Sequence, residues 1–428
     1  MRRGRPNARS ARTRPPEHFG TQAVASTRHV IIAGAGIGGL SAALALTRAG
    51  YRVTVLEQAP QLQETGAGIQ LSPNATRVLL ALGLRERLLP HVGAPDAVRV
   101  MAGASGRQIA EIPLGAEIER RYGAPYWVIH RGDLQMALAA AAGAEPDVTL
   151  KLDSRVEDFA QHVKGVSVQG RRGRDTVEER GLALIGADGL WSTVAERLHR
   201  QRPPAFAHHT AWRALLPAEQ VPAQFRAPAV HLWLGDDAHL VHYPVQAGKL
   251  VNIVAIVRDQ WRATGWSAAG TRSEIMRHFA RWSWCEQARA LVDTPEHWLK
   301  WALYHRRGAF RGGSGPVTLI GDAAHPMLPF LAQGAAMAIE DAAVLADMLA
   351  RYGDDPADAL RAYEGARRHR TARAQRAARR QGRLYGLSGP EAALRNLTMR
   401  LLGSERLLAR QHWLYSWQPP PLLRNSQP

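Results

Sequence analysis

The sequence predicts an α/β fold: a nucleotide-binding domain with a parallel sheet, interrupted by a second, mostly antiparallel sheet domain and followed by helices. Three observations lead to this prediction. A glycine-rich turn at residues 34–39 joins a strand to a helix, the hydrophobic period changes to two around residues 98–112 and 229–258, and an arginine-dense amphipathic stretch covers about residues 363–383. The first pattern is typical of parallel sheets and the second of antiparallel hairpins.

The composition is that of an ordinary globular protein. The chain has 428 residues, of which 46% are hydrophobic and 21% are charged. These values exclude general disorder, a collagen-like fibre and a small disulfide-stapled scaffold. Cys285 is the only cysteine, so no intrachain disulfide and no cysteine-rich zinc site can form, and we predict no metal site. Such cysteine usage favours a reducing compartment, and we expect a cytoplasmic protein.

The chain is strongly basic, with 55 Lys+Arg against 37 Asp+Glu and a formal net charge of +18. Such a field could attract nucleic acid, a membrane surface or small anions. The arginines are scattered, however, and are not interleaved with the stacking aromatics that nucleic-acid platforms use. A codon-usage bias toward arginine explains the charge more simply, and we expect no stable nucleic-acid partner.

The first predicted element is a βαβ unit. It has a strand at Val30–Ala33, a helix at about Gly38–Ala49 and a second strand at Val53–Glu57. Parallel-type strands return at Leu182–Ala187 and Val317–Gly321. The nucleotide-binding domain is therefore expected to be completed by distant parts of the chain.

Residues 1–27 precede this unit and have no apolar periodicity. Arg2-Arg3 suggests an export signal, but no apolar region follows the pair. A transit peptide and an over-early start codon remain as alternatives, and we expect a disordered basic tail. No stretch of the chain is long and apolar enough to span a bilayer.

The strongest local signal is Gly34-Ala35-Gly36-Ile37-Gly38-Gly39. Gly34 allows the tight turn, Gly36 lets the backbone approach a pyrophosphate, and Gly39 lets helix and strand pack closely. The N–H groups at the start of the helix would then face the phosphates. Glu57, about 20 residues further on, could accept hydrogen bonds from ribose hydroxyls. The motif indicates dinucleotide binding but does not distinguish NAD from FAD.

Three further segments make that distinction. They are HRGDL at 130–134, IGADGLWS at 185–192, and LIGDAAHP at 319–326, the last followed by QGA at 333–335. Together with residues 66–74 and 122–126, these motifs resemble those of the class A flavoprotein monooxygenases, which are single-component FAD-dependent aromatic hydroxylases. The resemblance covers about residues 28–383 and is greatest with the branch that holds salicylate hydroxylase, 3-hydroxybenzoate 6-hydroxylase and 6-hydroxynicotinate 3-monooxygenase.

The resemblance implies a Rossmann-like FAD-binding domain of the GR2 type and assigns cofactor residues by position. Gly34, Gly36 and Gly39 would hold the FAD pyrophosphate. Glu57, with Gln58 beside it, would hold the adenosine ribose.

The other cofactor assignments come from the three further segments. Arg131 would contact the flavin's linker and phosphates, and Asp322 would bind the ribityl chain. Asp188-Gly189 would serve both FAD and the passing nicotinamide cofactor. The helix that starts at Gly334-Ala335 would point its positive end at the flavin and stabilise negative charge there. Each acidic turn could instead be a helix cap or an Asx-turn.

The chain also departs from the family pattern. The acidic turn is usually followed by serine, two residues and arginine, whereas here Ser192 is followed by Ala195. An expected salt link or phosphate contact is therefore missing, unless Arg197 takes its place. Some relatives carry histidines at the positions of Gln70 and Phe330, so chemistry that depends on those histidines is not expected here.

The strand at residues 239–244 offers the catalytic candidates. With a period of two, His239, Val241 and Tyr243 share one face, while His242 points the other way. In the resembling hydroxylases an equivalent His/Tyr pair faces the substrate. His239 could take the phenol proton, since an unperturbed histidine pKa suits a base near neutrality, and Tyr243 could orient the substrate. A structural strand histidine is the alternative.

Four further residues are candidates for the substrate pocket. Arg213 could neutralise an acidic substrate, although a surface salt link explains it equally well. Pro329 and Phe330 suggest an apolar wall near the flavin, and Gln70 lies in one of the family motifs. The tryptophans between residues 212 and 301 more simply fill the core of the second domain than form an aromatic cage.

The reaction implied by the resemblance is aromatic hydroxylation. NADH or NADPH reduces bound FAD, O2 adds at flavin C4a, and the distal oxygen of the hydroperoxide attacks a small phenolic or hydroxybenzoate-like ring. No second dinucleotide motif is visible, so the nicotinamide cofactor should bind transiently, and the choice between the two is left open. A flavin-dependent epoxidase or tailoring oxidase, and a non-enzymatic basic binding protein, remain as alternatives. A homodimer is compatible with the sequence.

The chain is expected to alternate between two domains. The expected segments are a basic tail (1–27), three parts of the FAD-binding domain (28–97, 128–205 and 301–350), two parts of the substrate domain (98–127 and 206–300), and C-terminal helices and tail (351–428).

Overall fold

The computed structural model describes residues 28–62, 68–199, 203–262, 267–280, 284–306, 312–353 and 355–421. The expected basic tail at 1–27 and Gly66-Ala67 of one family motif lie outside the described residues. Within the described ranges, no helix has the length and apolar character needed to cross a membrane.

The predicted α/β fold class is confirmed, and its centre is a parallel sheet in the order β19-β12-β1-β2-β8. The strands are β1 (His29–Ala33), β2 (Arg52–Leu56), β8 (Val148–Lys151), β12 (Ala183–Gly186) and β19 (Val317–Leu319). Helices α1 (Ile37–Arg48), α5 (Arg131–Ala144) and α9 (Gly334–Tyr352) belong to this layer, with α2 (Pro73–Ala81), α3 (Arg85–Leu88) and α6 (Thr193–His199) around it. The sheet therefore combines strands from three distant parts of the chain.

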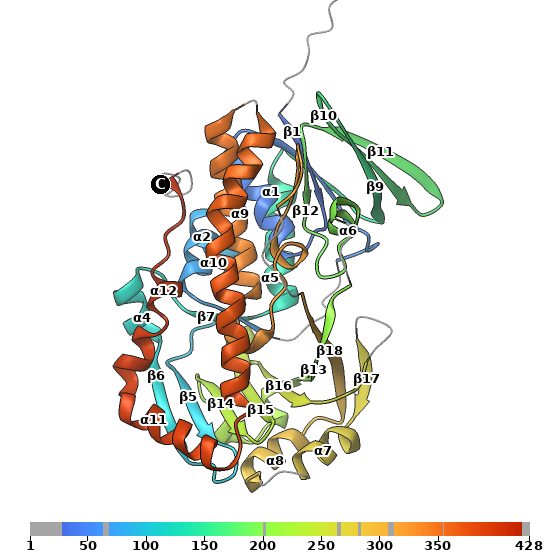
Figure 1. Ribbon diagram of the computed structural model, residues 1–428. Coiled ribbons are helices and arrows are strands. Elements are labelled where there is room, and N and C mark those ends of the chain that lie inside the picture. Colours follow the sequence, from blue (N-terminus) through green and yellow to red (C-terminus); the bar gives the residue numbers. More distant parts are fainter. Residues whose placement is uncertain are drawn as a thin grey trace, which may run out of the picture.

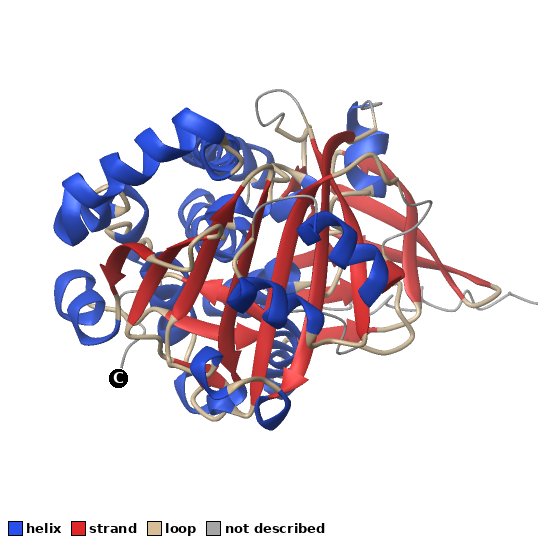
Figure 2. Cartoon of the chain, turned by 90° about the horizontal axis from the view of Figure 1, so that it is seen from below, coloured by secondary structure: helices blue, strands red, loops and turns tan. Residues whose placement is uncertain are grey.

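The second layer is an eight-stranded sheet in the order β17-β18-β13-β16-β15-β14-β5-β6, in which β14 and β5 form a parallel pair. Its strands are β5 (Ala97–Ala102), β6 (Gln108–Pro113), β13 (Ala205–Pro217), β14 (Val230–Gly235), β15 (Ala238–Val245), β16 (Leu250–Arg258), β17 (Ala268–Thr271) and β18 (His297–His305). Helices α7 (Arg272–Ala280) and α8 (Glu286–Asp293) cover one of its faces, as seen from below in Figure 2.

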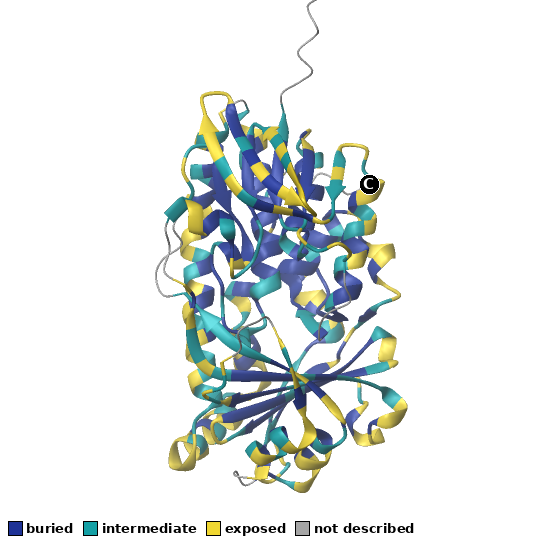
Figure 3. Cartoon of the chain, turned by 90° about the vertical axis from the view of Figure 1, so that its right-hand side faces the viewer, coloured by how far each residue is buried: buried dark blue, intermediate teal, exposed yellow. Residues whose placement is uncertain are grey.

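Two smaller sheets flank these layers. One is antiparallel, with β9 (Ser154–His162), β10 (Gly165–Arg172) and β11 (Asp175–Gly181), and Figure 3 shows how exposed its outer strands are. The other joins β3 (Gly68–Leu71), β4 (Val92–Gly93) and β7 (Trp127–His130).

The remaining helices connect the layers. They are α4 (Gly115–Tyr122), α10 (Pro356–Tyr385), α11 (Gly389–Ala409) and α12 (His412–Tyr415). The long helix α10 runs from beside α9 down to the large sheet (Figure 1).

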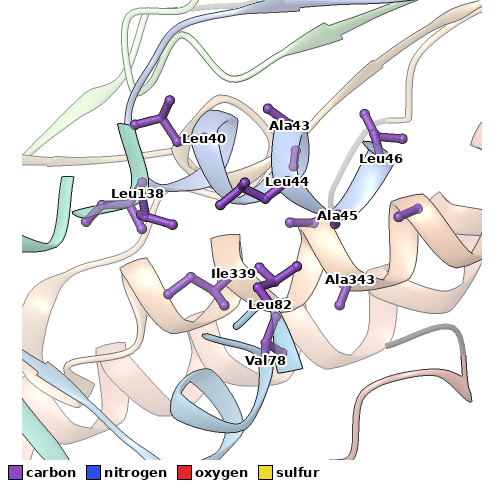
Figure 4. Packing of buried hydrophobic residues seen from close by; sticks show 14 of the residues in the cluster. Leu40, Ala43, Leu44, Ala45, Leu46, Val78, Leu82, Leu138, Ile339 and Ala343 are labelled. Atoms are coloured by element: carbon purple, nitrogen blue, oxygen red, sulfur yellow. The ribbon is translucent and has the colours of Figure 1, made fainter. Parts of the chain in front are cut away.

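Helices α1 and α9 form the centre of the main core. Leu44 and Ala45 of α1 face Ile339 and Ala343 of α9 in Figure 4, and all four side chains are at most 4% exposed. The two helices approach closely because a Cβ on Gly38 would already lie 3.2 Å from the Ala338 Cβ. Burial of this apolar surface fixes α9 against the glycine-rich turn that precedes α1.

The second core lies between the large sheet and helices α7 and α8. Trp212, Trp233, Trp284 and Trp298 are buried in it, each at most 5% exposed. These four tryptophans therefore fill a core, and they do not form an aromatic cage.

A pair of stacked histidines lies on the tryptophan side of this sheet. His231 of β14 and His242 of β15 are cross-strand partners whose ring centroids lie 4.5 Å apart at an interplanar angle of 3°. The Trp233 Nε1 donates a hydrogen bond to His242 Nδ1 at 3.2 Å. His242 thus faces away from His239, as strand alternation requires.

This pair predicts a loss of stability in mild acid. Burial and nearby Arg99 lower the pKa of His231 to about 4, and burial next to His231 holds the pKa of His242 well below its ordinary value. Both rings stay neutral in the folded protein, whereas unfolded histidines take up protons below about pH 6.5. We expect the Tm to fall as the pH drops from about 7 to about 5, and to fall less steeply in His231→Phe. If the Tm fell equally steeply with pH in wild type and in His231→Phe, the stacked histidines would not be the cause of the acid sensitivity.

Candidate cofactor and substrate site

The glycine-rich turn has the geometry of a phosphate cradle. Gly34 has a φ of +104° and donates its N–H to the Leu56 carbonyl at 2.7 Å. A Cβ on Gly39 would lie 1.9 Å from the Gly34 carbonyl oxygen, so this position needs glycine for packing. A Cβ on Gly36 would meet nothing within 4 Å. The open side of the turn is therefore at Gly36, where the sequence places a pyrophosphate.

Glu57 is held rigidly beside this turn. Its Oε2 accepts the Ala35 N–H at 2.7 Å, and its Oε1 accepts the Ala59 N–H at 2.9 Å. A carboxylate has about four acceptor positions, so Glu57 can still receive ribose hydroxyls. Gln58 is exposed next to it.

The two acidic turns have different environments. Asp188 accepts hydrogen bonds from the Ser192 hydroxyl and, at 3.1 Å, from the Val194 N–H, and it thereby caps α6. Gly189 follows with a φ of +77°. Asp322 makes no hydrogen bond to another described residue, and its side chain is exposed. The resemblance assigns different roles to the two turns, and in the structure Asp322 has a free carboxylate whereas Asp188 does not.

The neighbouring residues still affect the ionisation of the exposed Asp322 carboxyl. Its desolvation raises its pKa, while the charges of His325 and Arg131 act in the opposite direction. Arg131, at the start of α5, also lowers the pKa of Arg213. Arg131 is therefore near enough to both Asp322 and Arg213 for its charge to act on each of them.

His239 lies on β15 and packs against aromatic rings. It is 4% exposed, and its ring centroid is 5.5 Å from that of Phe330 and 5.1 Å from that of Tyr385. It makes no hydrogen bond within the described residues. Burial and His209 lower the pKa of His239 to about 3. The expectation of an unperturbed pKa was therefore wrong, because the apolar surroundings disfavour the charged ring.

Tyr243 and Gln70 lie together on the same side of the sheet as His239. Tyr126 donates a hydrogen bond from its hydroxyl to Gln70 Oε1 at 2.6 Å. Burial raises the pKa of the Tyr243 hydroxyl above its ordinary value. Tyr126 was not singled out as a site residue from the sequence.

Arg213 has no carboxylate partner among the described residues. Its guanidinium lies 4.9 Å from the Trp301 ring, and its buried Nε makes no hydrogen bond. Burial lowers the pKa of Arg213 to about 10, so it stays charged at neutral pH. The alternative of a surface salt link was wrong, and the residue is an unpaired cation facing Tyr243.

Phe330 forms the apolar wall of this side. It is 6% exposed and packs so closely on α10 that a Cβ on Gly382 would lie 2.5 Å from its ring. Pro329 begins the short turn that carries it.

Arg197 does not point toward the acidic turn at Asp188, since its Nε donates to the Glu157 carbonyl at 3.3 Å. It does not replace the arginine that is missing after Ser192.

The chain matches the model of a protein family described as an FAD binding domain over residues 27–380. It belongs to this FAD-binding family.

Its relatives within the family are aromatic hydroxylases. The 3-hydroxybenzoate 6-hydroxylase of Polaromonas naphthalenivorans is 37% identical over 392 residues, which cover 91% of this chain and 96% of the relative. The 6-hydroxynicotinate 3-monooxygenase of Bordetella bronchiseptica is 33% identical over 350 residues, which cover 81% and 89% of the two chains. A solved salicylate hydroxylase substrate complex aligns with a TM-score of 0.77 at 25% identity, over 94% of this chain and 98% of the other. The chain is thus a class A flavoprotein monooxygenase.

The residues present in this family member fit FAD. Gly36 opens onto free space, Glu57 keeps acceptor positions, and the carboxylate of Asp322 is exposed and free to bind a ligand. The start of α9, at Gly334-Ala335, is only half-buried, so its N–H groups are accessible to an anionic flavin ring.

A buried ion-pair network lies between helices α9 and α10. Arg367 of α10 donates from Nε to Asp341 Oδ1 at 2.6 Å and from Nη1 to Glu340 Oε2 at 2.7 Å. Asp341 Oδ2 also accepts the Gly321 N–H at 2.9 Å and pairs with His325 Nε2. The side chains of Arg367, Glu340 and Asp341 are at most 1% exposed. The network therefore ties α9 and α10 to the turn that follows β19.

Proposed function

We propose that this flavoprotein monooxygenase hydroxylates a small phenolic acid of the hydroxybenzoate type. The observation that carries the proposal is the half-buried guanidinium of Arg213 near Tyr243, whose buried Nε makes no hydrogen bond and which has no carboxylate partner among the described residues. A buried cation without a partner costs free energy unless an anion joins it. The names of the relatives fit this reading, since hydroxybenzoate and hydroxynicotinate each combine a carboxylate with a ring hydroxyl.

The chain's own residues would bind and orient this substrate. Arg213 would neutralise the carboxylate, Tyr243 would donate a hydrogen bond to a substrate oxygen, and Phe330 would exclude water from the ring. A ring nitrogen of neutral His239 would accept the phenol proton, which makes the aromatic ring a better nucleophile. Bound FAD, reduced by NAD(P)H, supplies the activation of O2 that places one oxygen atom on the ring and releases the other as water.

FAD would be held mainly by residues that follow the carboxyl ends of the parallel strands β1, β2 and β19. Gly34, Gly36 and Gly39 would cradle the pyrophosphate, and Glu57 with Gln58 would lie at the adenosine ribose. Arg131 would contact the phosphates and Asp322 the ribityl chain, with Gly334-Ala335 at the flavin ring. Asp188-Gly189 would shape the passage for the nicotinamide cofactor. Gln70 and Pro329 would line the substrate side.

We further propose a cytoplasmic homodimer. Helix α11 supports the dimer, because Leu394, Leu397 and Leu401 lie on one of its faces and are 66%, 51% and 74% exposed. Such an apolar stripe is typical of a contact with another chain. Light scattering of the purified protein would distinguish a dimer from a monomer.

The experiment that tests the proposed function is a substrate panel. The holoenzyme is incubated with O2, NADH or NADPH, and a set of phenolic acids, their methyl esters and the parent phenols. We expect NAD(P)H oxidation and hydroxylated product with at least one free acid, and much weaker binding of its ester. Equal turnover of acid and ester would show that Arg213 does not bind a carboxylate. FAD binding without any hydroxylated phenol would favour an epoxidase or a tailoring oxidase.

We expect Asp322→Ala to weaken FAD binding more than Asp188→Ala. Asp322 has a free carboxylate, and one hydrogen bond to a charged group contributes about 1.5–3 kcal/mol, so the Kd for FAD should rise about 10- to 100-fold. Asp188 is already engaged by Ser192 and Val194, and its loss should mainly lower the stability of α6 by about 1 kcal/mol. FAD titration of the two apoproteins measures the difference, and a larger loss in Asp188→Ala would reverse these assignments.

A further inference from the structure

Gln333 is the residue immediately before α9, but its side chain does not cap the helix. Its backbone carbonyl accepts the Met337 N–H at 2.9 Å, and this bond begins the hydrogen-bonding pattern of α9. A helix leaves the N–H groups of its first turn without partners inside the helix. Gly334 and Ala335 carry such groups and are half-buried, so these N–H groups are open to a ligand.

The amide of Gln333 belongs instead to a closed ring of three hydrogen bonds. Gln333 Nε2 donates to Ser72 Oγ at 2.9 Å, and Ser72 Oγ donates to Asn74 Oδ1 at 2.6 Å. Asn74 Nδ2 donates to Gln333 Oε1 at 3.1 Å and closes the ring. All three residues are at most 3% exposed, so water competes poorly for these bonds. Because Ser72 and Asn74 lie at the start of α2, the ring joins the start of α2 to the start of α9.

Glu340 fixes the direction of this ring. Asn74 Nδ2 also donates to Glu340 Oε1 at 2.6 Å, and the Glu340 carboxylate is held by two arginines of α10. A carboxylate only accepts hydrogen bonds, so the NH2 group of Asn74 must face it. The same NH2 group is the donor to Gln333, and the amide oxygen of Gln333 therefore points toward Asn74. The buried ion pairs thus determine where the Gln333 oxygen lies.

We propose that Asn74 is a positioning residue that holds the amide oxygen of Gln333 away from α9 and so keeps the first N–H groups of this helix free for the flavin. These N–H groups then stabilise the negative charge that the flavin gains on reduction. Without Asn74, the Gln333 oxygen is a buried acceptor that has lost its donor, and it turns to the N–H groups of its own helix. This inference rests on the placement of the flavin ring at Gly334-Ala335 in the proposed function and is independent of which substrate binds.

The reduction equilibrium of bound FAD tests the proposal without turnover. The FAD-loaded protein is reduced under anaerobic conditions together with a reference dye, and the absorbance of flavin and dye gives the equilibrium constant between them. Asn74→Leu removes the donor to Gln333. We expect it to make reduction of the flavin about 2- to 30-fold less favourable, which is the range for a charge near a helix N-terminus.

A double variant separates positioning from packing. Gln333→Leu has no amide oxygen that could bond to α9, so its reduction equilibrium should stay close to that of wild type. Asn74→Leu combined with Gln333→Leu should return to the value of Gln333→Leu alone. A purely structural role of Asn74 predicts the opposite result, a double variant that departs from wild type at least as far as Asn74→Leu. Asn74→Ala replaces Asn74→Leu in this cycle if the leucine variant does not bind FAD.

Thr76 provides a matched control on the same helix. It is fully buried, and its Oγ1 donates to the Pro125 carbonyl at 2.7 Å. Thr76→Val therefore removes a buried hydrogen bond of α2 that does not involve Gln333. Its Tm should fall, while its reduction equilibrium should equal that of wild type. A shift as large as that of Asn74→Leu would show that the effect comes from loosening α2, and would overturn the proposal.

Gly334→Pro distinguishes failure of this inference from failure of the proposed flavin placement. It removes one of the free N–H groups at a helix position where proline is tolerated. An unchanged reduction equilibrium in Gly334→Pro would show that the flavin ring does not lie at the start of α9, and both would fail. A less favourable reduction in Gly334→Pro, with no change in Asn74→Leu or no recovery in the double variant, would overturn only the role of Asn74.

Discussion

Replacing Arg367 by methionine is expected to lower the free energy of unfolding by about 3–5 kcal/mol, because it leaves buried carboxylates without their counter-ion. Arg367 is the group that bridges Glu340 and Asp341, and all three side chains are at most 1% exposed. Arg370 would still bind Glu340 through two nitrogens, whereas Asp341 would keep only Gly321 and His325. The measurement is the Tm of the FAD-loaded protein together with its urea midpoint.

Arg373→Met on the same helix is the control for this variant. The Arg373 guanidinium is exposed and lies 4.1 Å from the Trp413 ring, so its loss should cost less than about 1 kcal/mol. Equal losses in the two variants would show that burial of the ion pair does not matter.

The pKa of Asp341 gives this network a pH dependence as well. Its pairing with His325 and Arg367 overcomes the effect of burial and lowers the pKa to about 2. The contribution of the charged Asp341 to the free energy of unfolding is present above the pKa of an unfolded aspartate, about 4, and is lost as the pH falls toward 2.

Much of the fold was predictable because it depends on short-range patterns. The glycines at 34, 36 and 39 and the apolar strands on either side of them carry their own signal, and β1, α1 and β2 begin and end within two residues of the predicted bounds. The β9–β11 sheet was not predicted. Its strands are largely exposed, so they lack the alternation of apolar residues on which the prediction relied.

The site was harder to predict because its contacts join distant segments. Gln70, Tyr126 and Tyr243 come from β3, the loop before β7, and β15, and no local pattern relates them. The ion-pair network did leave a signal that we did not use. Glu340-Asp341 is a pair of adjacent acids inside an otherwise apolar helix, and buried charges of this kind require a partner such as Arg367.

The hydrogen bonds and the pKa of an individual side chain also could not be predicted from the sequence. Asp188 and Asp322 follow similar apolar strands, yet one caps α6 and the other stays free. In the same way, a histidine on a strand gives no indication of its pKa. The three rings around His239, from His209, Phe330 and Tyr385, come together only in the folded protein.

The largest effect on catalysis is expected for His239→Ala. The variant should retain FAD and should still be reduced by NAD(P)H, because His239 contacts Phe330 and Tyr385 and none of the proposed FAD residues. Hydroxylation should fall by about 10²–10⁴-fold, the usual loss when a general base is removed. The substrate ring would remain a neutral phenol, and more of the O2 would be reduced to H2O2 at the expense of NAD(P)H.

The quantity that decides this prediction is the ratio of hydroxylated product to NAD(P)H consumed, in wild type and in His239→Ala. His242→Gln is the control, because His242 lies on the opposite face of β15, stacked on His231, and its ratio should equal that of wild type. Since the pKa of His239 is lowered to about 3, its ring is neutral throughout the ordinary assay range. As the pH is lowered through about 6.5, the ordinary pKa of histidine, the ratio should therefore not fall in wild type. An unchanged ratio and an unchanged hydroxylation rate in His239→Ala would make His239 a structural strand residue.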